Sequence, residues 1–165
     1  MEEEEVMSRV HRQLSTIQDQ KEQLVRDIVR NEALGRDLRV RLTRGLGRRH
    51  LAKVTTFLSE QEKVVLLLLS LTSRLERAEE EASWGSITDW QKESRRKTQD
   101  ALREMLEEAG GLRSLNGHRL LQVVEMLETV GLEKEKMLLL TYVSNKEALL
   151  RVRNTCEHLE RRFAM

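Results

Sequence analysis

A block of valines and leucines at residues 64–71, interrupted only by Ser70 and set between charged segments, is the feature that most constrains the fold of this chain. Apolar residues continue on both sides of the block at spacings of three, four or seven residues, so they share helical faces. One face carries Val54, Phe57, Val64, Leu68, Leu71 and Leu75, and a second face carries Leu58, Val65 and Leu69. A helix with two apolar faces must meet two neighbours, which predicts a helical bundle or assembly.

The same block is too short to cross a membrane, because a membrane-spanning helix needs about 20 apolar residues. The chain opens with the acidic run Glu2–Glu5, whereas a signal peptide opens with basic residues. We therefore expect a cytoplasmic domain. Residues 1–165 should form a single helical module that is a piece of a larger protein.

The composition favours long helices over sheets. Charged residues make up 35% of the chain and aromatic residues 3%, and proline is absent. The net charge of +1 offers no basic surface for nucleic acid. The single cysteine, Cys156, excludes an internal disulfide and lies on an apolar helical face, where we expect it to be buried as a small hydrophobic residue.

No pattern in the sequence indicates catalysis. The four histidines are scattered, and none stands at metal-ligand spacing from a cysteine or carboxylate. The glycines do not form a phosphate-binding loop of the Gly-x-x-x-x-Gly-Lys type. The sequence therefore predicts a protein that is not an enzyme and has no cofactor, no metal, no nucleic-acid partner and no membrane insertion.

The first two helices are expected at residues 6–42 and 49–82, separated by Gly45 and Gly47. Three residues interrupt the apolar frame of the first helix: Lys21, Asn31 and Gly35. A third helical segment should begin after Ser86, which has Asp89 three residues later in a pattern close to a capping box.

Glycines weaken the helix predicted in the C-terminal half. Gly110, Gly111 and Gly117 together could cost about 3 kcal/mol of helix stability relative to alanine. We therefore predict a local break around these residues. A final helix after Gly131 carries an apolar face that ends near Phe163.

Two all-α architectures satisfy these patterns. The chain could fold as a three-helix bundle, made of the first helix, the second helix and a long interrupted C-terminal helix. Alternatively, two chains could pair as an extended, segmented antiparallel coiled-coil dimer. Both arrangements bury the same residues, because a bundle and a domain-swapped dimer share their local contacts.

Three segments of the chain resemble one known family. Residues 63–77 contain Lys63-Val64-Val65, then Leu67-Leu68-Leu69-Ser70-Leu71, then Arg74-Leu75 and Arg77. Upstream, Leu24-Val25-Arg26-Asp27-Ile28 leads into Asn31-Glu32-Ala33-Leu34-Gly35, and a weaker match near the end contains Tyr142-Val143, Lys146, Ala148 and Leu149. In this order and spacing they are similar to the C-terminal Apx/Shroom domain 2 of the Shroom family.

The resemblance implies a non-catalytic scaffold that docks the coiled coil of Rho-associated kinase and recruits the kinase to the actin cytoskeleton. The module would drive actomyosin contraction and cell-shape change, with a cytoskeletal location that includes apical cell junctions. Any contact with actin would be indirect, through other parts of a larger protein. The implied kinase-binding residues are Ser70, Leu71, Ser73, Arg74, Leu75, Arg77, Ala78 and Lys146.

Some positions depart from the family pattern. Glu76, Ala78 and Glu80 stand where the family prefers alanine, valine and asparagine, so a glutamate lies beside the docking arginines. An alternative function is a purely structural coiled-coil module that dimerises an actin-associated protein. A membrane-surface helix bundle is disfavoured, because it would need a basic face.

Overall fold

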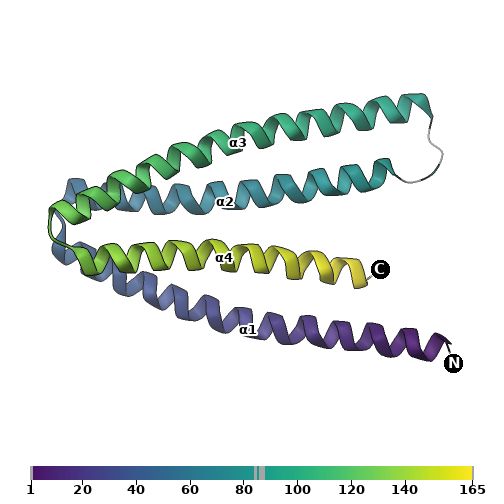
Figure 1. Ribbon diagram of the computed structural model, residues 1–165, viewed down its shortest axis with the longest axis horizontal. Coiled ribbons are helices and arrows are strands. Elements are labelled where there is room, and N and C mark those ends of the chain that lie inside the picture. The colour runs from purple at the N-terminus through teal and green to yellow at the C-terminus, as the bar shows by residue number, and fades with distance from the viewer. Residues whose placement is uncertain (1, 84, 86–87, 165) are drawn as a thin grey trace. The chain divides into compact units, whose positions relative to one another are not determined.

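The computed structural model describes residues 2–83, 85 and 88–164, and that part of the chain forms four α-helices (Figure 1). Helix α1 spans Glu2–Gly45, α2 spans Arg48–Ala82, α3 spans Asp89–Thr129 and α4 spans Glu133–Ala164. The described ranges contain no strand, so the predicted all-α fold class is confirmed. Helix α1 packs against α4, and α2 packs against α3, so that the chain divides into two compact units.

Helices α2 and α3 form an antiparallel pair. Near the middle of α2, the Asn116 side chain donates a hydrogen bond to Gln61, and nearer its C-terminal end Gln99 donates to the carbonyl of Ala78. The core of this end of the pair consists of Leu71, Leu102 and Ala109, packed against Leu68, Leu75, Ala78 and Leu106. The first apolar face predicted for residues 54–75 is therefore the face that α2 packs on α3.

Helices α1 and α4 are also antiparallel. Lys21 pairs with Glu160 at 2.6 Å, Asn31 hydrogen-bonds the carbonyl of Tyr142, and Gly45 lies against Leu132. The hydrogen bond to Glu160 raises the pKa of Lys21 above its ordinary value. Cys156 is buried in α4, as predicted. Because the partners run in opposite directions, the chain's two ends lie at the same end of this pair (Figure 1).

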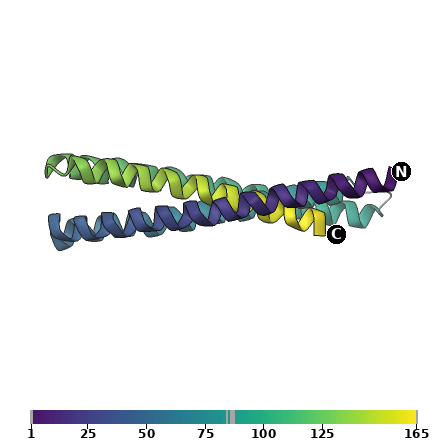
Figure 2. The same cartoon turned by 90° about the horizontal axis from the view of Figure 1, so that it is seen from below.

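The first turns of α1 extend beyond the C-terminal end of α4. Both views of the molecule show this extension (Figures 1 and 2). The first buried residue of α1 is Ile17, whereas Met7 and Leu14 are exposed and Val10 is half-buried. The apolar frame of α1 therefore continues along several turns that α4 does not bury.

A glycine allows α1 and α4 to approach closely. A Cβ atom added to Gly35 would lie 2.5 Å from Cε2 of Tyr142, whose ring is fully buried. Such a separation is shorter than van der Waals contact, so only glycine leaves room for the ring at this position.

The interrupted C-terminal helix of the predicted bundle is two helices in the structure, α3 and α4. Helices α3 and α4 are separate, because the chain turns at Gly131, where φ is +79°. Glycine adopts this left-handed conformation without the steric cost of a Cβ atom, and it commonly ends helices. The bundle and the segmented coiled-coil dimer both contain antiparallel pairs, so the choice between these two architectures stays a prediction.

The predicted break around Gly110, Gly111 and Gly117 is wrong, because α3 continues through all three residues. The helix buries a residue at every seventh position on the face toward α2: Leu102, Ala109, Asn116 and Val123. This packing outweighs the weak helix propensity of the glycines, since tertiary contacts supply most helix stability in proteins.

Helix α3 begins with a reciprocal capping interaction. The backbone amide of Gln91 donates to the Thr88 hydroxyl, while the Thr88 amide donates to the Gln91 side chain. This is the capping box of a helix N-terminus. The predicted cap, Ser86, lies outside the described residues.

Helix α1 begins at Glu2 rather than at the predicted Val6. Its acidic first turn therefore lies at the positive end of the helix dipole, where negative charge is stabilising.

We predict that replacing both Gly110 and Gly111 with alanine stabilises the protein. Both have helical backbones, and an added Cβ atom would meet nothing within 4 Å at either position. The gain should be about 1 kcal/mol for each substitution, the usual difference in helix propensity. Urea denaturation followed by circular dichroism measures it.

Gly35→Ala is the matched control, because it makes the same chemical change where there is no space. It should lower the free energy of unfolding, as the Tyr142 ring must move. If the double alanine variant loses stability, the helix does not continue through Gly110 and Gly111.

Candidate partner-binding surface

The structure divides the predicted binding residues of α2 into an inward and an outward set. Leu71 is 3% exposed, and Leu75 and Ala78 are half-buried beside it against α3. Ser70, Arg74 and Arg77 are exposed, and Ser73 is half-buried. The two leucines and Ala78 therefore hold α2 against α3, while Ser70 and the two arginines face solvent.

Four exposed residues of α2 form a continuous strip, which we call the α2 outer face. They follow one another at spacings of three, four and three residues, so they share one side of the helix. The α2 outer face consists of Leu67, Ser70, Arg74 and Arg77. It combines an apolar side chain, a hydroxyl group and two guanidinium groups on a helix whose opposite side packs against α3.

Leu67 was not among the binding residues predicted from the sequence. Its side chain is 41% exposed, and Leu66 beside it is also exposed. The spacing from Leu67 to Ser70 and Arg74 was available in the sequence. However, Leu67 belongs to neither of the two apolar faces predicted for this helix, and it was given no role in binding.

The two arginines of the α2 outer face keep their charges available. Among the residues that the structure describes, no carboxylate forms an ion pair with Arg74 or Arg77. The nearby Glu79 instead pairs with Arg103 of α3 at 3.2 Å. Glu76 and Glu80 are exposed on α2.

Lys146 lies on α4, in the other helical pair. Its ammonium nitrogen is 3.5 Å from a carboxylate oxygen of Glu32 and 3.3 Å from the Tyr142 hydroxyl. It also stands 5.6 Å from the centre of the Tyr142 ring. The side chain is 23% exposed, so these contacts hold Lys146 in place at the surface of the pair.

The other two segments that resemble the family pack against each other in the α1·α4 pair. Asn31 and Gly35 contact Tyr142, and Glu32 pairs with Lys146. These two sequence matches therefore describe one packed contact, which the sequence alone did not connect.

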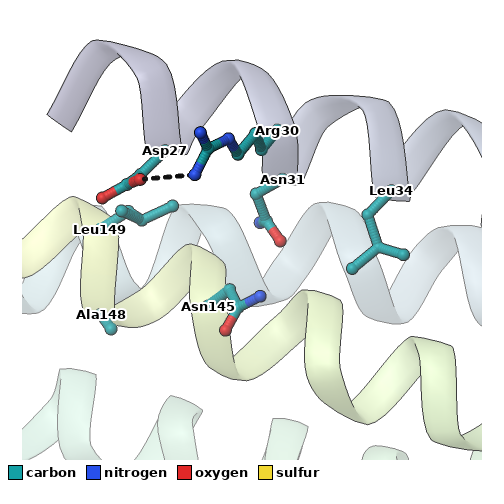
Figure 3. A pocket seen from close by; sticks show the side chains of 7 residues that line it. All are labelled: Asp27, Arg30, Asn31, Leu34, Asn145, Ala148 and Leu149. Carbon is teal, nitrogen blue, oxygen red and sulfur yellow. Dashed lines mark ion pairs between the residues drawn. The ribbon is translucent and has the colours of Figure 1, made fainter. Parts of the chain in front are cut away.

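A pocket of about 370 Å³ opens between the same two helices (Figure 3). Leu34, Ala148 and Leu149 supply its apolar lining, and Asp27, Arg30, Asn31 and Asn145 supply polar groups. Asp27 and Arg30 form an ion pair at 3.9 Å on α1, drawn as a dashed line. The pocket therefore combines apolar and polar side chains of α1 and α4.

The described residues contain no cluster of three or more histidine, cysteine or carboxylate groups that could hold a metal. Across the same residues, none of the helices has a stretch long and apolar enough to cross a membrane.

Comparison with known proteins identifies the family of this chain. The family model for the Apx/Shroom domain ASD2 matches residues 1–160, which is nearly the whole sequence. No curated protein matches the chain significantly. The chain therefore belongs to the Apx/Shroom domain ASD2 family, whose members are non-enzymatic protein-interaction domains.

Proposed function

We propose that this domain docks the coiled coil of Rho-associated kinase and recruits the kinase to the actin cytoskeleton. The observation that carries the proposal is the α2 outer face, where Arg74 and Arg77 lack an ion-pair partner in the described chain beside the exposed Leu67. Family membership supports a protein-binding role of this kind.

The proposed contact is helix against helix. Leu67 would bury apolar area on the kinase helix, and each guanidinium group would bind a carboxylate there. Because arginine offers several donors in a planar fork, two arginines one turn apart suit two carboxylates with the same spacing. The proposed partner surface is therefore an acidic face of a coiled-coil helix.

The remaining predicted residues have different parts in this proposal. Leu71, Leu75 and Ala78 contribute by holding α2 on α3, because they pack inward. Ser70 and Ser73 border the arginines, and Lys146 provides a second contact from the α1·α4 pair. Docking would act in the cytoplasm, concentrate kinase activity at actin structures and so promote actomyosin contraction there.

The departures from the family pattern tune this surface. Glu76 and Glu80 add negative charge near Arg74 and Arg77 and should weaken attraction to an acidic partner. Glu79 has less effect, because its carboxylate already pairs with Arg103.

We predict that Arg74→Glu combined with Arg77→Glu weakens kinase binding and leaves the fold intact. Arginines at the centre of an interface are worth about 2 kcal/mol or more, which corresponds to a loss of affinity of roughly 30-fold. Isothermal titration against the coiled coil of Rho-associated kinase measures the dissociation constant. The melting temperature should stay nearly constant, since both side chains are exposed.

Arg36→Glu combined with Arg39→Glu is the matched control. These arginines are exposed, stand three residues apart on α1 and lie outside the proposed surface. This control has the same net charge as the test variant and should bind like the parent protein. Equal losses in both variants would mean that net charge, rather than the α2 outer face, governs binding.

A second candidate function is coiled-coil dimerisation, and one specific observation favours it. Met7 is 70% exposed and Leu14 is also exposed, on the turns of α1 that extend past α4. These residues continue the apolar frame that α4 buries further along α1. A helix from a second chain would complete this frame, as in the segmented dimer.

If the domain dimerises through these turns, Leu14→Asp should lower its average molar mass. A carboxylate in an apolar helical seam must lose hydration without gaining a partner. Light scattering after gel filtration measures the mass, and Gln13→Asp, at an exposed position beside the seam, is the control. A parent protein that remains monomeric at high concentration would contradict this second function.

A further inference from the structure

Each helical pair contains one buried asparagine. Within the described residues, Asn31 and Asn116 are the two buried polar side chains, and Asn116 is only 1% exposed. The Oδ1 atom of each asparagine has no hydrogen-bond partner among those residues. A buried amide with an unsatisfied oxygen lowers stability relative to a leucine of similar size, so its presence calls for another explanation.

In coiled coils, a buried asparagine selects the register and the partner of a helix at some cost in stability. Asn116 has the contact that such a role requires. Its Nδ2 atom donates to Oε1 of Gln61 at 2.8 Å, across the seam between α3 and α2. Gln61 belongs to the face of α2 that packs on α3.

Gln61 is the one polar residue along that face. Its other members are Val54, Phe57, Val64, Leu68, Leu71, Leu75 and Ala78. A slip of seven residues would keep the apolar seams of α2 and α3 in contact, with a displacement of roughly 10 Å along the axis. It would place Asn116 opposite Val54 or Leu68, where the amide has no side-chain partner.

The α1·α4 pair has additional features that fix its register. A slip of seven residues would move the Tyr142 ring from Gly35 to Ile28 or Leu42. The side chain at either position would occupy the space that Gly35 leaves for the ring. It would also separate Lys21 from Glu160. In the α2·α3 pair, the same slip would break the exposed Arg103–Glu79 ion pair and the hydrogen bond from Gln99 to the Ala78 carbonyl. The apolar seam of this pair tolerates displacement, and Asn116–Gln61 is the contact between side chains that involves a fully buried polar group.

We propose that the Asn116–Gln61 hydrogen bond is the specificity determinant of the leucine-rich helix α2. It selects α3 as the partner of α2 and fixes the register between the two helices. The two residues act by raising the free energy of every other arrangement, in which their amides would be buried without a partner. The leucine face by itself would accept another leucine-rich helix or a displaced α3. This assignment does not depend on kinase binding.

The test replaces both residues with leucine in the full chain. Gln61→Leu with Asn116→Leu is compared with the parent after Cys156→Ala, with spin labels on cysteines introduced at Ala52 and Gln122. Both label sites are exposed, on α2 and α3 respectively. Electron–electron double resonance measures the label separation, and light scattering measures the molar mass over a range of concentrations.

We expect one narrow distance in the parent. In the leucine variant we expect either a second, displaced distance or concentration-dependent association that the parent lacks. The exchanged pair, Gln61→Asn with Asn116→Gln, keeps two amides at the contact and should behave like the parent. Circular dichroism confirms helix content in each protein, and Asn116→Leu alone provides a milder variant of the same test.

Two results would overturn the proposal. The first is a leucine variant, double or single, with the distance and mass of the parent, which would show that the apolar packing alone fixes the register. The second is an exchanged pair that is as heterogeneous as the leucine variant, because the shape of the side chains rather than their polarity would then be responsible.

Discussion

Two paired helices bury one side of each helix and leave the other side in water. This constraint determines which side chains of the leucine-rich segment of α2 are exposed to solvent. Leu71 and its inward neighbours are committed to α3, which fixes the rotation of α2 about its own axis. That rotation brings Leu67, Arg74 and Arg77 outward together. One short sequence thus supplies both the packing of the pair and the surface that it displays.

The apolar frame and the all-α class could be predicted because heptad spacing is a local property of the sequence. The face of α2 that packs on α3 and the burial of Cys156 both follow from spacing alone. The glycines of α3 were misjudged for a related reason. Propensity is also local, whereas the packing that keeps α3 continuous through Gly110 and Gly117 comes from α2.

The interruptions in the frame of α1 could be located in the sequence but not explained there. Lys21, Asn31 and Gly35 each meet a residue of α4 that is more than 100 positions away in the chain, namely Glu160 or Tyr142. No periodicity links such distant positions. The same limit applies to the proposed binding surface, where the resemblance indicated the arginines but only the packing on α3 showed which neighbours stay exposed.

The antiparallel course of α1 and α4 has a mechanical consequence. Because the chain's ends lie at the same end of this pair, tension between the two ends would pull the helices apart sideways (Figure 1). The contacts would then break in sequence, beginning at Lys21 and Glu160 and reaching Tyr142 later. Peeling of this kind loads one turn at a time, whereas a pull along the axis would load every turn at once. A domain held under tension at both ends would therefore open at low force, with α1 and α4 separating first at the end of the pair where the tension is applied.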